Sequence, residues 1–164
     1  ETIHYGRLQG GDIVYLATRE SSQYLRPYSR VGRRLPAYST AMGKALLAER
    51  LSGPDPQDWS DRVPPTMPAL TPHTIVDRDQ LRQELTETLA RGYAIDREEN
   101  VLGVTCFAFA LRLGGVPSDA ISCSIPVERL GAREPQILEA LRRTRHAIER
   151  MAPVDLNGTS PSPV

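Results

Sequence analysis

The sequence lacks the long apolar runs and the net charge that would assign it to two large classes of protein. No apolar run approaches the ~18 residues that a membrane-spanning helix needs, so we expect no membrane partner. Its 20 basic and 20 acidic side chains cancel, whereas nucleic-acid-binding domains are usually strongly basic. If the protein acts on DNA, this segment is not expected to be the part that touches it.

Cysteine and histidine are too few and too scattered to predict a metal centre or a thiol enzyme. His4, His73 and His146 show no paired spacing among themselves or with Cys106 and Cys123, and no base stands near Cys106. No glycine-rich phosphate loop is present. We therefore expect no catalytic residue, metal or cofactor. The cysteines are interpreted as buried thiols of a reducing cytoplasm, with a disulfide as the less favoured alternative.

The length predicts one domain. A chain of 164 residues can bury one core, which we place over residues 1–152, and the Pro- and Ser-rich tail at 153–164 is predicted to be disordered. Because the chain opens on Glu1 without an initiating Met, we interpret it as a piece of a longer protein. Among the basic residues Lys44 is the only lysine, which makes it worth attention.

The first half predicts a hairpin followed by a helix. Strands are expected over residues 3–8 and 12–19 around a glycine turn, and both faces of the second strand are expected to be covered. An arginine-rich loop over 20–38 precedes a helix that begins near Thr40, in which Gly43 indicates a close backbone approach. The prolines that follow indicate a surface connection, with at most one short helix near Trp59.

The second half predicts helix, hairpin and helix. Asp77 and Gly92 match the two caps of a helix between them, strands are expected over 101–111 and 119–125, and a last helix runs from about Pro135 to Met151. The whole order predicts an α+β fold, an antiparallel β-sheet with helices packed on it.

Two serines carry the strongest chemical signal. Alternation places Ser122 and Ser124 on one face of their strand, and a buried hydroxyl without a partner costs ~1–3 kcal/mol. A polar ligand would supply that partner. The alternative is that both hydroxyls face water or bond to nearby backbone.

Further candidates stand on other segments. Asp96, in an expected acidic loop, and Cys106, on the following strand, could converge on one space, although each is also explained as a loop acid and a small core residue. The helix start near Thr40 offers N–H groups that suit a carboxylate.

Several blocks in one order resemble the C-terminal effector-binding domain of IclR-type bacterial transcription factors, over nearly the whole chain. They are Val31–Pro36, Thr40–Ala48, Gly92–Asn100, Gly103–Cys106 and Ala120–Ser124. The resemblance implies a GAF-like fold, a small-molecule effector such as an organic acid or aromatic carboxylate, self-association as a dimer or tetramer, and a cytoplasmic protein. It also implies that operator DNA is bound through an N-terminal winged helix-turn-helix domain that is absent here.

The resemblance also implies ligand-binding positions. They are Ala41, Met42, Gly43, Asp96, Val104, Cys106, Ser122 and Ser124. The chain departs from the family pattern at Met42, where small residues are common, and at Ile125, where glycine is common. A bulky Met42 would shrink the pocket or make it more apolar.

Two hypotheses follow. The first is a ligand-sensing and oligomerisation domain whose effector carboxylate is held by the helix start, Ser122 and Ser124. The second is an interaction module that only assembles oligomers and whose pocket is vestigial. An enzyme is a distant third.

Overall fold

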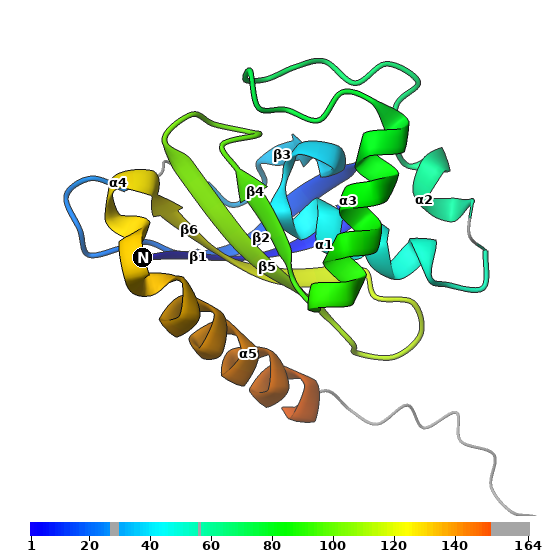
Figure 1. Cartoon of the computed structure of the whole chain (residues 1–164). Coiled ribbons are helices and arrows are strands. Elements are labelled where there is room, and N and C mark those ends of the chain that lie inside the picture. The colour runs from blue at the N-terminus through cyan, green and yellow to red at the C-terminus, as the bar shows by residue number, and fades with distance from the viewer. Residues whose placement is uncertain (27–29, 56, 152–164) are drawn as a thin grey trace, which may run out of the picture.

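The computed structural model describes residues 1–26, 30–55 and 57–151, and the tail at 153–164 lies outside them. The chain forms a six-stranded antiparallel sheet in the order β3-β2-β1-β6-β5-β4 (Figure 1). The strands are β1 (Thr2–Gln9), β2 (Asp12–Arg19), β3 (Arg34–Pro36), β4 (Ala94–Arg97), β5 (Val104–Leu111) and β6 (Asp119–Pro126). The helices are the 3-10 turns η1 (Ala37–Ser39) and η2 (Gly131–Arg133), with α1 (Ala41–Leu51), α2 (Asp58–Asp61), α3 (Arg78–Arg91), α4 (Val127–Leu130) and α5 (Glu134–Met151). The α+β prediction is confirmed.

Helices cover both faces of the sheet. The inner face packs on α1, and α3 packs in turn on α1, whereas α5 lies against β5 and β6 on the outer face (Figure 1). The sheet therefore separates two apolar cores.

Strands β5 and β6 divide their side chains between these cores as alternation predicts. Cys106 pairs with Ser124, and Ala108 with Ser122, so small or polar side chains face inward and let α1 approach. Cys123 belongs to the outer core. Both cysteines are free thiols, as predicted, and their opposite faces keep them apart. The core under α5 also contains Phe107, Phe109, Ile121, Ile125 and Leu141.

Local sequence signals determine where α1 starts and where α3 starts and ends. The Thr40 hydroxyl accepts a hydrogen bond from the Gly43 N–H at 3.1 Å. A Cβ on Gly43 would lie 2.1 Å from the carbonyl oxygen of Ala37, which confirms the predicted close approach. Asp77 caps α3, and Gly92 ends it with a φ of 80°. These features are local, and the sequence predicts all of them.

The prediction that both faces of β2 are covered is wrong. Ile13 and Tyr15 are buried on the inner face, but Leu16 remains 38% exposed and Ala17 is exposed. The register shifts beside Gly6, so Leu16 falls between the paired residues Tyr15 and Ala17. Helix α5 contacts β5 and β6 and leaves this end of the outer face open.

The predicted strand start at Val101 is also wrong. Residues 98–103 form a turn, with φ of 61° at Glu98 and 77° at Gly103, and β5 begins at Val104. Asp96 stands on the short strand β4 rather than in a loop. On the opposite edge, Leu35 is extended as Pro36 requires, and it joins β3 instead of remaining in the expected loop.

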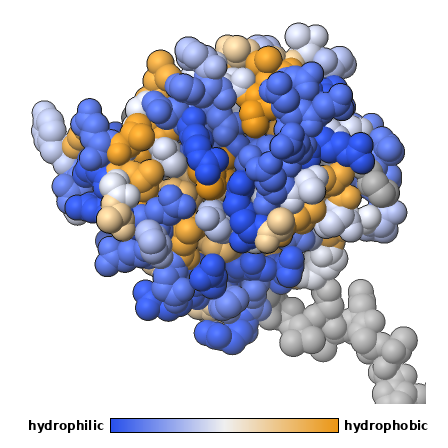
Figure 2. Space-filling view, in the orientation of Figure 1, coloured by the Kyte–Doolittle hydropathy of each residue, from blue (hydrophilic) through white to orange (hydrophobic). Residues whose placement is uncertain are grey.

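One face of the molecule is mainly polar (Figure 2). Hydrophilic residues predominate on the face shown in Figure 2, and apolar residues gather there in separate patches. Within the described ranges, no helix has the length and apolar character needed to cross a membrane.

Candidate functional site

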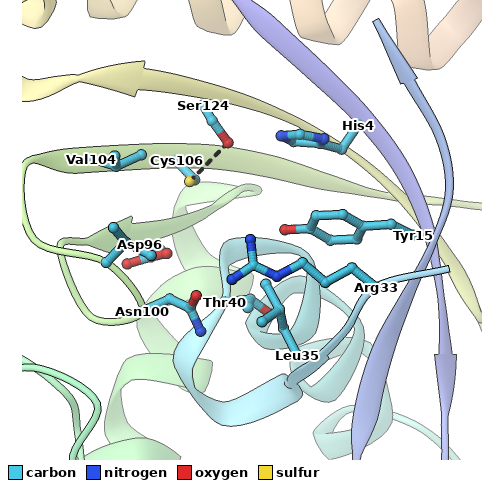
Figure 3. Close-up of a pocket in the computed structure, with 11 residues that line it drawn as sticks. His4, Tyr15, Arg33, Leu35, Thr40, Asp96, Asn100, Val104, Cys106 and Ser124 are labelled. Carbon is cyan, nitrogen blue, oxygen red and sulfur yellow. Dashed lines mark hydrogen bonds between the residues drawn. The ribbon is translucent and has the colours of Figure 1, made fainter. Parts of the chain in front are cut away.

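A cavity of about 270 Å³ lies on the inner face of the sheet beside the start of α1. Every strand contributes to its wall directly, and the turn between β4 and β5 closes one side (Figure 3). Because both edge strands reach the same cavity, the sheet curls around it. The lining residues are His4, Tyr15, Arg33, Leu35, Thr40, Asp96, Asn100, Val101, Val104, Cys106 and Ser124.

Four of the eight predicted ligand-binding residues meet at this cavity. They are Asp96, Val104, Cys106 and Ser124, and they come from three neighbouring strands. The antiparallel register places Cys106 beside both Asp96 and Ser124. Segments that are far apart in the sequence therefore converge as expected.

The other four predicted residues are buried but do not line the cavity. Ala41, Met42 and Gly43 face the core, and the Met42 Cε packs towards Gly6. Ser122 lies deeper on β6, between its partners His4 and Ala108. Met42 therefore neither shrinks nor lines this cavity. The residue that brings the helix start to the wall is its cap, Thr40.

Several lining residues are absent from the predicted set. The family resemblance could have pointed to three of them, because its sequence blocks contain Arg33, Thr40 and Asn100. His4 and Tyr15 gave no such signal, because their place depends on β1 pairing with β6 more than 100 positions later.

The acidic wall is held rigidly by hydrogen bonds. Asp96 Oδ1 accepts from the Glu99 N–H at 2.7 Å. The Thr71 hydroxyl donates to the Glu98 carbonyl at 2.7 Å, and the Thr74 hydroxyl donates to the Glu99 carbonyl at 2.6 Å. These bonds hold the backbone of the turn in place, although Glu98 has a positive φ that L-residues seldom adopt.

Behind this wall lies a buried ion-pair cluster around the sole lysine. Lys44 Nζ is 2.5 Å from Glu99 Oε1 and 3.5 Å from Glu84 Oε1, and the Lys44 side chain is 0% exposed. Arg91 pairs with Glu84 from the other side. Glu99 Oε2 has no hydrogen-bond partner within the described part of the chain. Burial raises the pKa of Glu99 against the effect of Lys44.

Asp96 belongs both to the cavity and to this cluster. It is 3% exposed, and burial, followed by the charge of Glu99, raises its pKa to about 7. Its carboxyl group therefore takes up and releases protons near neutrality.

The opposite wall is aromatic, with one cation. His4 stacks on Tyr15 with ring centroids 4.8 Å apart, and burial and the charge of Arg33 lower the pKa of His4 to about 4. His4 is therefore neutral at pH 7, and Arg33 supplies positive charge to the lining. In Figure 3 the Arg33 side chain extends between Tyr15 and Asn100 into the cavity.

The thiol of Cys106 is suited to packing rather than to nucleophilic attack. Its Sγ lies 3.1 Å from Ser124 Oγ. Burial and the neighbouring Asp96 raise the pKa of the thiol well above its ordinary value, whereas a reactive cysteine needs a lowered pKa. Over residues 1–26, 30–55 and 57–151, no three His, Cys, Asp or Glu side chains are grouped to hold a metal ion. The arrangement favours binding over chemistry.

Comparison with known proteins identifies the family. The family described as bacterial transcriptional regulator IclR C-terminal matches residues 1–150. The HTH-type transcriptional regulator KdgR of Escherichia coli is 36% identical over 153 residues, which cover 88% of this chain and 54% of KdgR. The chain spans about half the length of the curated relatives it matches.

Solved structures agree. IclR of Thermotoga maritima aligns with a TM-score of 0.81 and 28% identity, covering 94% of this chain and 62% of that one. A double mutant of the PobR inducer-binding domain from Acinetobacter, solved as a complex with 3-hydroxybenzoic acid, aligns with a TM-score of 0.79 and 26% identity, covering 92% of this chain and 88% of that one.

These neighbours agree with the predicted GAF-like α+β fold. The curated relatives are transcriptional regulators and not enzymes, as the sequence predicts. The chain belongs to the IclR family of bacterial transcriptional regulators and carries the C-terminal domain of that family.

Proposed function

We propose that this domain senses a small organic acid, aliphatic or aromatic, in the cavity on the inner face of the sheet. The observation that carries the proposal is the convergence of all six strands on one void that has a cation and several polar groups in its wall. The PobR inducer-binding domain has a similar fold, and a double mutant of it was solved in complex with 3-hydroxybenzoic acid, which supports the proposal.

The size of the cavity supports a small ligand. Ligand pockets for drug-sized molecules run from about 300 to 1,000 Å³, and this one measures about 270 Å³. A benzoate-sized acid suits that volume, and its ring suits the stacked His4 and Tyr15.

The positive charge of Arg33 in the cavity wall supports a ligand that carries a carboxylate group. The Arg33 guanidinium has the planar geometry that binds a carboxylate through two hydrogen bonds. Thr40 and Asn100 add polar side chains, and Ser124 remains a predicted contact. Ser122 and the first residues of α1 are not among the proposed direct contacts, because none of them lines the cavity.

In the full-length cytoplasmic regulator, effector binding would control DNA binding by the N-terminal domain. A ligand shifts such an equilibrium only through a difference in affinity between two states. Dimers or tetramers of this domain would couple the two functions.

The alternative is an interaction module with a vestigial cavity. Val101, on the cavity wall, is 46% exposed, and Leu25 and Leu102, which line a second hollow that shares Val104 with the cavity, are 58% and 56% exposed. Such apolar side chains suit contact with another subunit.

Thermal melting separates the two possibilities, because a specific ligand raises the melting temperature in proportion to the logarithm of its concentration. The domain is melted with benzoate, hydroxybenzoates and short oxo acids, each beside its uncharged amide. We expect at least one acid to stabilise the domain, and its amide to do so much less.

The matched variants are Arg33→Gln and Arg34→Gln. Arg33 lines the cavity, whereas its neighbour Arg34 is exposed and pairs with Asp12 at 3.2 Å. Arg33→Gln is expected to lower acid affinity at least about tenfold, the effect of losing a charged hydrogen bond, and Arg34→Gln to leave it unchanged. Equal losses in both variants, or no stabilisation by any acid, would count against the proposal.

A further inference from the structure

Among the residues that the structure describes, Asp96 is the one carboxyl group that both lines the cavity and contacts the buried ion-pair cluster. It lines the cavity on β4, and its Oδ1 accepts from the Glu99 N–H. Glu99 in turn contacts Lys44. A charge that enters the cavity is therefore felt directly by this cluster.

The cluster already holds more acid than base. Lys44 from α1 pairs with Glu99 and Glu84, Arg91 from α3 pairs with Glu84, and Asp96 adds a third carboxyl group next to Glu99. Glu99 Oε2 is buried and lacks a hydrogen-bond partner among the residues described. With all five groups ionised, one negative charge is left over in a region of low dielectric, where charges interact strongly.

On the cavity side, the charge comes from Arg33. Among the described residues that line the cavity with Asp96 and Arg33, the other titratable side chains are His4 on β1, Tyr15 on β2 and Cys106 on β5, and all three are uncharged at pH 7. An effector carboxylate that pairs with Arg33 therefore uses the positive charge of the lining. A second anion at Asp96 would then have no cation of its own in the cavity.

We infer that the cavity takes up an effector carboxylate together with one proton, which is held on the carboxyl group of Asp96. The proton comes from solvent and converts the Asp96 carboxylate to the neutral acid. Its O–H can donate to an oxygen of the effector, while Oδ1 continues to accept from the Glu99 N–H. This inference rests on the proposed function and deepens it.

Proton uptake has a defined pH range. The pKa of Asp96 in the free domain is about 7. Below pH 7 the Asp96 carboxyl group is mostly protonated, and the affinity of the domain for the effector acid is constant. Above pH 7 the site must first bind a proton, and acid affinity is expected to fall about tenfold per pH unit. The effector stays ionised throughout, because ordinary carboxyl groups titrate near pH 4.

Calorimetry tests this directly. An acid that stabilises the domain is titrated into it at pH 8 in phosphate, imidazole and Tris, whose ionisation enthalpies differ. The slope of the observed enthalpy against the ionisation enthalpy of the buffer gives the protons taken up. We expect about 0.9 proton per acid at pH 8, from the pKa of about 7.

Asp96→Asn removes the titrating group and keeps an oxygen that can accept from the Glu99 N–H. Uptake is expected to vanish in this variant, and acid affinity to be the same at pH 7 and pH 9. The control is Glu98→Gln, because Glu98 lies two residues after Asp96 but does not line the cavity. This variant should take up as many protons per acid as the wild-type domain.

Acid binding to the wild-type domain without proton uptake overturns this inference and leaves the proposed function standing. Uptake that persists in Asp96→Asn also overturns it. If no acid binds at any pH, the proposed function fails, and this inference fails with it. The wild-type measurement decides the matter even if a variant does not fold.

Discussion

At the scale of single residues, Lys44 has the most unusual position. Its ammonium group is enclosed by α1, α3 and the turn after β4, and it contacts carboxylates 40 and 55 positions away in the sequence. The sequence marked it as the only lysine, but no local pattern could reveal partners at that separation. A buried ion pair of this kind specifies which groups meet, and its net contribution to stability is small.

Removing one partner is expected to be costly. Lys44→Met leaves Glu99 buried without a cation, and breaking a buried pair in this way costs about 3–5 kcal/mol. The double variant Lys44→Met with Glu99→Leu removes the orphaned charge and should recover a large part of that loss. Urea unfolding of both proteins measures the difference.

A single variant that loses less than about 1 kcal/mol would show that the remaining carboxyl groups adapt by taking up a proton. A double variant less stable than the single would contradict the expectation outright.

The residue scale also shows where prediction from sequence succeeded. Asp96, Cys106 and Ser124 were expected to share one space, and the register brings them together. Alternation along a strand gave the correct face for each. Alternation does not give the depth along the strand, and for this reason it does not reveal that Ser122, which pairs with His4 and Ala108, lies outside the cavity lining.

At the scale of elements, the contact between α1 and η1 depends on Gly43. The helix backbone lies against Ala37, and a Cβ at position 43 would sit 2.1 Å from its carbonyl oxygen. Real Cβ atoms do not approach backbone so closely, so α1 would have to move away from η1 and from the cavity wall at Thr40.

Gly43→Ala is therefore expected to lower the free energy of unfolding by about 3 kcal/mol or more, at the upper end of overpacking effects. The control is Gly92→Ala, since Gly92 has a φ of 80° and open space around it. It should cost only the ~1 kcal/mol of a left-handed residue. Equal losses in the two variants would contradict the role given to the close approach.

Elements with local signals could be predicted, and elements made by tertiary pairing could not. Helix α3 carries Asp77 and Gly92 at its two ends, which fix its limits within the sequence. Strands β3 and β4 have three and four residues. These two strands form because a neighbouring strand pairs with them. Their own sequences are typical of loops, so the sequence alone does not predict them.

At the scale of the whole molecule, the cavity lies where the two edges of the sheet approach each other. Strands β2, β1, β6 and β5 each pair on both sides, whereas β3 and β4 pair on one side only. The edges therefore supply Leu35 and Asp96 to the wall while being the least supported strands.

Amide hydrogen exchange should report this arrangement. We expect the slowest exchange in β1, β6 and β5 and the fastest strand exchange in β3 and β4. With a bound acid, protection should increase in the edge strands and in the turn at 98–103, because the ligand contacts both. Helix α5 serves as the internal control, and a rise in protection confined to α5 would place the ligand on the wrong face.

The pairing of β1 with β6 joins the beginning of the domain to its end and closes the fold. Apolar patterns predicted both strands, but many pairings satisfy such patterns, and the sheet order was accessible only through resemblance to a known family. The two separate cores follow from that order, since β5 and β6 then present one face to α1 and the other to α5.

The burial of Lys44 has a practical outcome for anyone who modifies this chain chemically. Amine-directed acylating reagents need an accessible, uncharged amine, and the sole lysine of the sequence has an exposed fraction of 0%. In the folded state, such reagents should therefore leave Lys44 unmodified. A label found on Lys44 would then mark molecules in which α1 and α3 had separated. The rate of labelling at Lys44 would therefore report how often this part of the domain opens.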